Sequence, residues 1–360
     1  MTTGGDCSGL NTAIHRLVVG GLRRGYKMIG ILDGTDGLTS AGAPHTIEFK
    51  PDTLPIEYAR LSGSWLRNGN SAANALDFES AARLGRTVEF ARKMKKSLAE
   101  LKLDAMILIG GNGSLSLAHR GRDIYGNVQL ICIPKTIDMD VPLTDTTIGF
   151  ATAVQQLAGF CDQLILTAKS HHRWFVVQSM GRDTGNLALN GGIACGADAI
   201  LIPEIKFKTD ALIAHIKKIE RDTGRDYGVI IASEGINLRG HSGRPADMIS
   251  RELTRAGINN RTAFPEHTQR AGDTTATDRI LATQMADAAL NAVDAGEAYV
   301  MMASQNGRIK SVPLADMFAA GDVQPDPKIP TVFVSNAYVP DDSPLLPMAV
   351  GMGIYVGEMR

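Results

Sequence analysis

The sequence predicts an α/β fold, with mainly parallel sheets that carry helices on both faces, divided into about two domains. Its length of 360 residues is roughly twice that of a typical domain. Short apolar runs rich in β-branched residues alternate with longer amphipathic stretches. This alternation is typical of parallel strands joined by crossover helices. Hydrophobic residues make up 44% of the chain and charged residues 21%, which excludes a disordered polypeptide.

Six apolar runs have the length of a buried strand, and most of them end at a glycine, a proline or an acidic residue. Runs that are apolar throughout predict strands covered on both faces, as in parallel sheets. The predicted strands span 28–32, 106–109, 130–133, 174–177, 199–202 and 229–231.

Amphipathic stretches between these runs are long enough to be crossover helices. The predicted helices span 9–24, 79–100, 148–168, 209–222 and 274–295. A polar, glycine-containing segment at 236–247 predicts an exposed loop.

Charge and cysteine content exclude several classes of protein. The chain has 37 Lys and Arg residues against 38 Asp and Glu residues, a net charge of -1, so we expect no nucleic-acid partner. The four cysteines at 7, 132, 161 and 195 are too widely spaced for a metal motif or a disulfide scaffold. We expect a cytoplasmic protein without a membrane partner, because no signal sequence or long apolar segment is found.

Two glycine-rich turns come directly before predicted helices. The first is Gly-Gly-Asp-Cys-Ser-Gly-Leu-Asn at 4–11, and the second is Gly-Gly-Asn-Gly-Ser at 110–114. Glycine lets the backbone approach a phosphate, and a helix N-terminus supplies N–H donors, although either turn alone is also consistent with a tight connection. Only three residues precede Gly4, too few for the strand expected there, which suggests a truncated or miscalled start.

A third cluster is Pro-Lys-Thr-Ile-Asp-Met-Asp at 134–140, directly after a predicted strand. Asp138 and Asp140 suit a base for a hydroxyl group and a ligand for a divalent cation, while Lys135 and Thr136 can contact phosphoryl oxygens. Phosphoryl transfer needs these groups. A solvated acidic turn is the alternative.

Polar residues also follow the predicted strands of the second half of the chain. Arginines and a histidine at such positions can clamp a sugar phosphate, with Glu234 accepting hydrogen bonds from sugar hydroxyls. Surface arginines are more often only solvated, so their position near strand ends is what favours a site. The candidates are Arg173, Met180, Gly181, Arg182, Glu234, Arg261, His267 and Arg270.

Taken in order, these motifs resemble those of the phosphofructokinase family, over positions 4 to about 290. The matching segments also include Thr-Asp-x-Thr-Ile-Gly-Phe at 144–150, Ile-Ala-x-Gly-Ala-Asp at 193–198 and His-x-Gln-Arg-x-Gly from 267. The resemblance implies two Rossmann-like three-layer domains. The donor-binding domain is expected at 1–149 plus about 270–320, and the domain that binds fructose 6-phosphate at 150–269 plus about 321–360.

The resemblance also implies a role for each matching residue. Asp138 is similar to the base that takes the proton from the sugar 1-hydroxyl, and Asp140 to its magnesium-linked partner. Thr136 resembles the residue that bonds the transferred phosphoryl group, Arg182 the one that stabilises the transition state, and Lys135 a lysine near the phosphates. Mg²⁺ is the expected cofactor.

The remaining matches concern binding. Gly5, Gly113 and Ser114 match contacts to the donor phosphates. The fructose 6-phosphate contacts are expected at Thr136, Asp138, Met180, Gly181, Arg182, Glu234, His267 and Arg270. Arg173 and Arg261 match two arginines supplied by a neighbouring subunit, which implies a homodimer or homotetramer with shared active sites.

Four positions depart from the family pattern. Asn112 stands where a magnesium-binding Asp is usual, so the expected metal ligands are Asn112 and Asp140, with an amide as the weaker ligand. Met139 replaces a usual Asn, and His15 and Val19 replace arginines of the bacterial effector site.

The sequence leaves alternatives for the phosphoryl donor and for the activity of the protein. Family members that use pyrophosphate usually have Asp at the position of Gly113 and Lys at the position of Lys135. Glycine cannot exclude the α-phosphate of ATP, so we expect ATP, with pyrophosphate as the alternative. A kinase of NAD or lipids, or an inactive regulatory subunit that binds sugar phosphates, are the other hypotheses.

Overall fold

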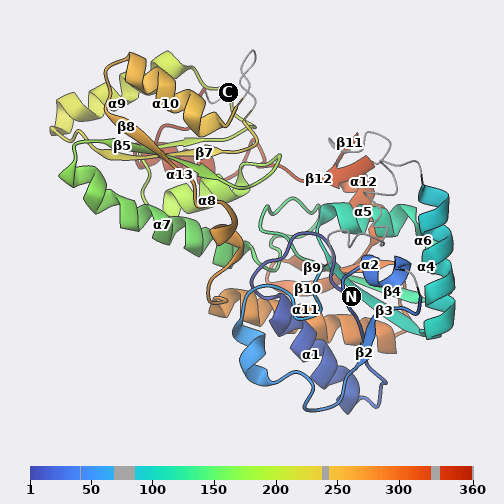
Figure 1. Cartoon of the computed structure of the whole chain (residues 1–360). Helices are drawn as coiled ribbons and strands as arrows, with labels where there is room; N and C mark the ends of the chain where they lie inside the picture. Colours follow the sequence, from blue (N-terminus) through green and yellow to red (C-terminus); the bar gives the residue numbers. More distant parts are fainter. Residues whose placement is uncertain (41, 69–85, 237–242, 326–332, 359–360) are drawn as a thin grey trace. The chain divides into compact units, whose positions relative to one another are not determined.

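The computed structural model describes residues 1–40, 42–68, 86–236, 243–325 and 333–358, and the chain divides into two units (Figure 1). The first unit comprises Met1–Thr136, Asp140–Gly149 and Gly272–Ala337, and the second comprises Ile137–Met139, Phe150–Ala271 and Tyr338–Arg360. The boundary expected near residue 320 lies at Ala337 instead. The reason is that β11 (Asp322–Pro325) and β12 (Phe333–Asn336) pair with each other, and β12 packs on helices of the first unit.

The main sheet of the first unit has four strands in the order β10-β9-β4-β3. β3 (Ala105–Gly110), β4 (Gln129–Pro134) and β9 (Val300–Gln305) are parallel, and β10 (Arg308–Pro313) returns antiparallel to β9. The strands predicted at 106–109 and 130–133 are therefore confirmed as β3 and β4. β9 and β10 were not predicted.

A separate pair of strands corrects one prediction. The run at 28–32 was expected to be a parallel strand, but β1 (Ile29–Ile31) pairs antiparallel with β2 (Thr46–Glu48). The polar segment after β1, which contains the short helix α2 (Asp36–Thr39), turns the chain back to form β2. An apolar composition predicts burial but does not fix the direction of the neighbouring strand.

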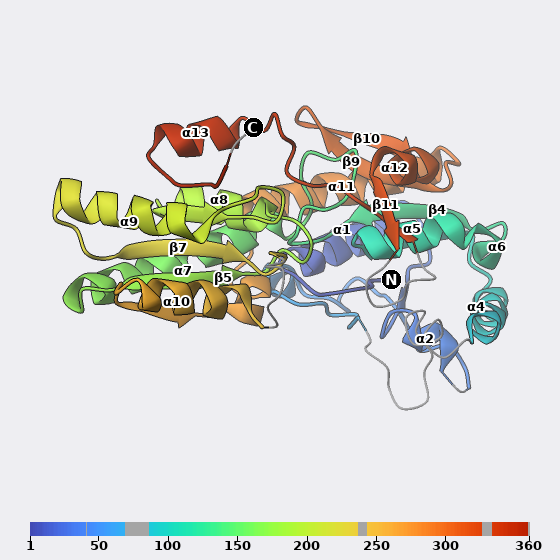
Figure 2. The same ribbon diagram turned by 90° about the horizontal axis from the view of Figure 1, so that it is seen from above.

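Helices cover both faces of the first unit's main sheet. α1 (Leu10–Arg23) and α11 (Ala276–Asp294) pack side by side, and α11 contacts β4, β9 and β10 (Figure 2). The other face carries α4 (Thr87–Leu101), α5 (Asn112–Arg120), α6 (Arg122–Tyr125) and α12 (Leu314–Ala320). Phe90 of α4, Leu115 of α5 and Met317 of α12 share one core with Leu108 and Leu130 of the sheet. The predicted helix at 79–100 begins at Thr87 among the described residues, and 79–85 lies outside them.

The second unit has the sheet order β6-β7-β5-β8, with every pair parallel. The strands are β6 (Ala199–Leu201), β7 (Gly228–Ser233), β5 (Trp174–Ser179) and β8 (Asn260–Ala263). This arrangement confirms three predicted strands, whereas β8 was not predicted. Its polar sequence lies at the sheet edge, where a strand does not need to be apolar on both faces.

Helices also cover both faces of the second sheet, which confirms the three-layer architecture (Figure 1). α9 (Thr209–Thr223) and α10 (Pro245–Arg255) pack on the face that carries Val176 and Ile230. α7 (Phe150–Ser170) and α8 (Asn186–Ala194) pack on the opposite face, where Gly192 closely approaches Ile231. Of the loop predicted at 236–247, residues 237–242 lie outside the described part, and α10 begins at Pro245.

Two 3-10 turns and one further helix complete the described elements: η1 (Ile56–Arg60), η2 (Glu266–Arg270) and α13 (Leu345–Gly351). No helix among the described residues combines the length and the apolar character needed to cross a membrane.

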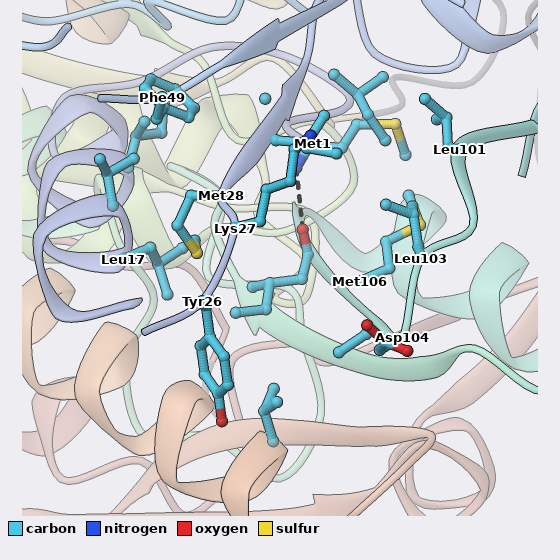
Figure 3. Close-up of a pocket in the computed structure, with 18 of the residues that line it drawn as sticks. Met1, Leu17, Tyr26, Lys27, Met28, Phe49, Leu101, Leu103, Asp104 and Met106 are labelled. Carbon is cyan, nitrogen blue, oxygen red and sulfur yellow. Dashed lines mark hydrogen bonds between the residues drawn. The ribbon is translucent and has the colours of Figure 1, made fainter. Parts of the chain in front are cut away.

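The first three residues extend along the free edge of β3. Thr2 forms a parallel bridge with Ile109, and the Met1 ammonium group donates a hydrogen bond to the Ile107 carbonyl at 3.0 Å. Burial lowers the pKa of this ammonium group to about 5. A cavity of about 340 Å³ lies beside Met1, between β1 and β3, and is lined mainly by apolar side chains such as Leu17, Met28 and Met106 (Figure 3).

Gly9 is a position whose conformation and surroundings both restrict the residue to glycine. It precedes α1 with φ +95°, and an added Cβ would lie 2.6 Å from Cγ2 of Ile148. Gly25 also has a positive φ of +82°, but nothing lies within 4 Å of its Cβ position. A substitution at Gly25 therefore tests backbone strain alone, whereas a substitution at Gly9 tests backbone strain together with close packing.

We expect Gly25→Ala to destabilise the protein by about 1–2 kcal/mol through backbone strain alone, and Gly9→Ala by about 1–3 kcal/mol more through overpacking. Thermal unfolding followed by circular dichroism measures both midpoints. Equal shifts in the two variants would contradict the close contact with Ile148.

Candidate active site

The first glycine-rich turn is held in place by a buried lysine. Lys135 is 2% exposed, and its Nζ donates hydrogen bonds to the backbone carbonyls of Thr3, at 3.0 Å, and of Gly5. Gly4, between these two residues, has φ +74°, a conformation that favours glycine. Lys135 follows β4, so the lysine ties the turn before α1 to the carboxyl end of the central strands.

The second glycine-rich turn lies beside the first. The hydroxyl group of Thr3 donates to the Ser114 hydroxyl at 2.9 Å. A Cβ on Gly110 would lie 2.5 Å from Cβ of Ser114 and 2.8 Å from Oγ1 of Thr3, so this close approach requires glycine. The structure thus brings together four predicted residues of the first unit: Gly5, Gly113, Ser114 and Lys135.

Asn112, a predicted metal ligand, is the first residue of α5 and is 3% exposed. Its Oδ1 accepts the N–H of Gly113 at 2.6 Å, and its Nδ2 donates to Oδ1 of Asn336. Asn336 is a site residue that the sequence did not indicate, because the strand before it was not predicted. The amide of Asn112 therefore stabilises the helix start and connects it to the end of β12.

Backbone hydrogen bonds hold both ends of the segment Lys135–Asp140 in place. The Thr136 N–H donates to the Ile148 carbonyl at 3.1 Å, and its own carbonyl accepts from the Thr147 hydroxyl at 2.7 Å. The carbonyl of Asp140 accepts the Ala337 N–H at 2.9 Å. Thr136 and Asp140 are both buried.

Asp138 and Met139 belong to the second unit, where a residue before α8 and the first residue of α8 hold them. The Thr184 hydroxyl donates to the carbonyl of Asp138 at 2.9 Å, and Nδ2 of Asn186 donates to the carbonyl of Met139 at 3.1 Å. Met139 has φ +53°, a strained conformation for a residue with a side chain. Asp138 as a whole residue is buried, with 9% of its surface exposed. Thr184 and Asn186 were not predicted.

Glu234, after β7, orders the Met180–Arg182 turn. Its Oε1 accepts the backbone N–H groups of Gly181 at 3.1 Å and Arg182 at 2.9 Å. The pKa of Glu234 is raised, mainly by burial and also by the negative charge of Asp138, while these two N–H groups and Arg270 oppose the shift. The second unit thus places the charges of Asp138 and Arg270 and the backbone N–H groups of Gly181 and Arg182 around Glu234.

The other predicted contacts are positioned differently. His267 and Arg270 lie in η2, which follows β8, and the Gln269 side chain accepts the N–H of Met180 at 3.2 Å. Arg173 precedes β5, at the opposite end of that strand from Met180, and Arg261 is exposed within β8. The six residues of β5 span about 20 Å at 3.3 Å each, so one chain does not bring Arg173 to Glu234.

Both predicted metal ligands, Asn112 and Asp140, would bind a metal ion through a side-chain oxygen. The described residues contain no group of three or more His, Cys, Asp or Glu side chains that could enclose a metal ion. Mg²⁺ is commonly held by one or two carboxylates together with water and substrate phosphates. Asp140 is hydrogen-bonded through its carbonyl to Ala337, the residue after the Asn112 partner Asn336, and one carboxylate with an amide fits that mode of binding better than a cage made of protein alone.

The geometry defines an α/β protein whose glycine-rich turns and helix N-termini have the features of sites that bind phosphorylated ligands. The family model described as Phosphofructokinase matches residues 1–293. The chain therefore belongs to the phosphofructokinase family.

Individual relatives support the same assignment. The chain is 36% identical to the ATP-dependent 6-phosphofructokinase of Thermosynechococcus vestitus, over 99% of this chain and 92% of that protein. It is 33% identical to ATP-dependent 6-phosphofructokinase 1 of Nostoc sp. strain PCC 7120, over 99% of this chain and 98% of that protein. The solved phosphofructokinase of Saccharomyces cerevisiae matches with a TM-score of 0.77 and 28% identity. That match covers 88% of this chain and 44% of the yeast chain.

The raised pKa of Glu234 gives a testable dependence of stability on pH. Because the folded protein holds the carboxyl proton more tightly than the unfolded chain, this group makes stability fall as pH rises from the usual carboxyl pKa through the raised value. Glu234→Gln keeps an oxygen that accepts both N–H groups but does not titrate. We expect the unfolding midpoint of wild type, relative to this variant, to fall across that interval. Parallel pH profiles of the two midpoints would contradict the assignment.

Proposed function

We propose that the chain is an ATP-dependent 6-phosphofructokinase, which transfers the terminal phosphoryl group of ATP to the 1-hydroxyl of fructose 6-phosphate. The observation that carries this proposal is the segment Lys135–Asp140. It joins a lysine that anchors the glycine-rich turns to a buried carboxylate that belongs to the group around Glu234. The chain itself keeps Thr136 and Asp138 within two residues of each other. The names of the relatives support ATP as the donor.

In this proposal, the first unit binds the donor. The backbone N–H groups at the start of α5, with Gly113 and Ser114, face the donor phosphates together with Gly5. Gly113 has no side chain to occupy the space of the α-phosphate. Lys135 contributes positive charge beside the same turns while its hydrogen bonds hold the backbone.

The second unit binds the sugar phosphate. Glu234 fixes the backbone of Gly181 and Arg182, so that Arg182 can stabilise the charge that develops on the transferred group. Met180, His267 and Arg270 contact the sugar phosphate. Arg173 and Arg261 complete the site of a neighbouring subunit, which makes the active form a homo-oligomer. This role is supported by the place of Arg173 at the far end of β5.

Asp138 acts as the base. Its carboxylate takes the proton of the sugar 1-hydroxyl as the oxygen attacks the phosphoryl group, and Thr136 donates a hydrogen bond to that group. When bound, Mg²⁺ neutralises phosphate charge, and Asp140 and Asn112 would hold it. Glycolysis in the cytoplasm is the setting in which these substrates meet.

A coupled assay with fructose 6-phosphate and ATP, pyrophosphate or no donor tests this function. We expect turnover with ATP. Asp138→Asn should lower kcat by at least about 100-fold with little change in the KM for fructose 6-phosphate, as for the loss of a general base. Turnover only with pyrophosphate would favour the alternative donor, and none with either would favour a regulatory subunit. Near wild-type kcat in the variant would remove Asp138 from the mechanism.

The donor prediction concerns Gly113→Asp. A carboxylate placed about 4 Å from the α-phosphate costs about 4 kcal/mol at an effective dielectric constant near 20. We expect kcat/KM for ATP to fall by at least about 100-fold, while pyrophosphate-dependent activity survives or rises relative to ATP. Gly113→Asn is the matched control, because it has the same shape without the charge. A fall in kcat/KM for ATP of the same size in both variants would indicate steric exclusion. No fall in either variant would show that the α-phosphate of ATP does not lie beside Gly113.

A further inference from the structure

Two cysteines of the second unit have no part in the proposed mechanism. Cys161 lies in α7 and is 2% exposed, and Cys195 is the partly exposed residue that directly follows Ala194, the last residue of α8. Both are free thiols. The cysteines are far apart in sequence, but they lie on two helices that pack against each other.

Close packing of α7 and α8 brings these thiols together. A Cβ on Gly191 of α8 would lie 2.5 Å from Cδ2 of Leu157 in α7, so the helix backbones approach closely there. Cys161 follows Leu157 by four residues, and Cys195 follows Gly191 by four residues. Residues four apart lie on the same face of a helix, one turn along, so Cys161 and Cys195 form the next contact of the same interface. The two thiols are close enough to affect each other's pKa, and the Cys195 thiol donates a hydrogen bond to the Gly192 carbonyl at 3.4 Å.

The two thiols differ in chemical character. Interaction with Cys161 lowers the pKa of Cys195, and a backbone hydrogen bond at Ala197 acts in the same direction. The pKa of Cys161 is raised, first by the interaction with Cys195 and then by burial. A more acidic, partly exposed thiol beside a buried one is the arrangement of a nucleophilic cysteine with a resolving partner.

We propose that Cys161 and Cys195 are a redox-active dithiol that hydroperoxides convert to a disulfide. The sulfur of Cys195 attacks one peroxide oxygen, which leaves a sulfenic acid and releases water from H₂O₂. The thiol of Cys161 then attacks the sulfenic sulfur, so that the S–S bond forms and a second water molecule leaves. Two thiols lose two electrons and two protons in total, and one peroxide is reduced to two waters.

The start of α8 connects this dithiol to the candidate active site. α8 has 9 residues, so Cys195 lies about 14 Å from Asn186, the first residue of the helix, at 1.5 Å per residue. Immediately before and within that turn, Thr184 and Asn186 hold the carbonyls of Asp138 and Met139. Disulfide formation requires the Cβ atoms to approach to about 3.8 Å. Because Gly191 and Leu157 are already in close contact, we expect α8 to pivot rather than to translate, which displaces the segment that carries Asp138.

The linkage itself is tested by mass spectrometry on the full chain. The reduced protein is titrated with H₂O₂, alkylated under denaturing conditions and digested. We expect the loss of two hydrogens and a linked peptide that contains Cys161 and Cys195, reversed by dithiothreitol. Cys195→Ser and Cys161→Ala should not form it, whereas Cys132→Ser should, because Cys132 is fully buried elsewhere. Over-oxidation of Cys195 in wild type at the rate seen in Cys161→Ala would overturn the proposal.

The effect on catalysis rests on the proposed function and is measured separately. We expect oxidation to lower kcat by at least about 5-fold in wild type and to leave Cys195→Ser unchanged, with recovery on reduction. A disulfide that forms without a change in kcat would overturn the connection through α8. If no donor supports turnover, the proposed function fails, and the peptide analysis still decides whether the dithiol exists.

Discussion

The hydrogen bonds from Lys135 to the carbonyls of Thr3 and Gly5 are the constraint on which the donor half of the site depends. A buried ammonium group is costly unless its donors are satisfied, and here backbone carbonyls satisfy two of them. The same bonds fix a turn in which Gly4 has a positive φ and which only three residues precede. Together with the bridge from Thr2 to Ile109, Lys135 determines where α1 begins relative to β3 and β4.

The same principle recurs in the second unit with the charges reversed. There, the carboxylate of Glu234 accepts two backbone N–H groups and holds Gly181 and Arg182 at positive φ values of +143° and +52°. A residue such as Arg182 adopts this conformation only when the surrounding structure compensates its strain, which is of the order of 1–2 kcal/mol. Each unit therefore uses one charged side chain, the buried Lys135 or the half-buried Glu234, to fix the backbone of one turn of the candidate site.

The sequence was sufficient for most strands that are buried on both faces, although the buried interior strand β9 was not predicted. β3, β4, β5 and β7 each contain an apolar run, at 106–109, 130–133, 174–177 and 229–231, and the composition of these runs predicts central strands. β8 and β10 lie at sheet edges, carry polar residues, and have no comparable pattern. The sequence also did not predict whether neighbouring strands run parallel or antiparallel. β1 is the example, because its pairing with β2 depends on the path of the chain after the strand.

The same limit applies to the candidate site. Turns at strand ends were predictable, because glycines and acids follow apolar runs. Their partners were not, since the contact between Asn112 and Asn336 joins positions 224 residues apart, and nothing local to Asn336 marks it. Long-range contacts of this kind become visible only when the fold is known.

Asn112 shows how a departure from the family pattern is accommodated. Its amide accepts a hydrogen bond from Gly113 and donates one to Asn336, and an ionised Asp could accept the first but could not donate the second. Compared with Asp, Asn112 lacks the negative charge but adds a hydrogen bond that connects α5 to the end of β12. In the proposed enzyme, this difference leaves Asp140 as the main anionic ligand of the first unit for Mg²⁺, so that more of the metal's binding must come from the donor phosphates and water.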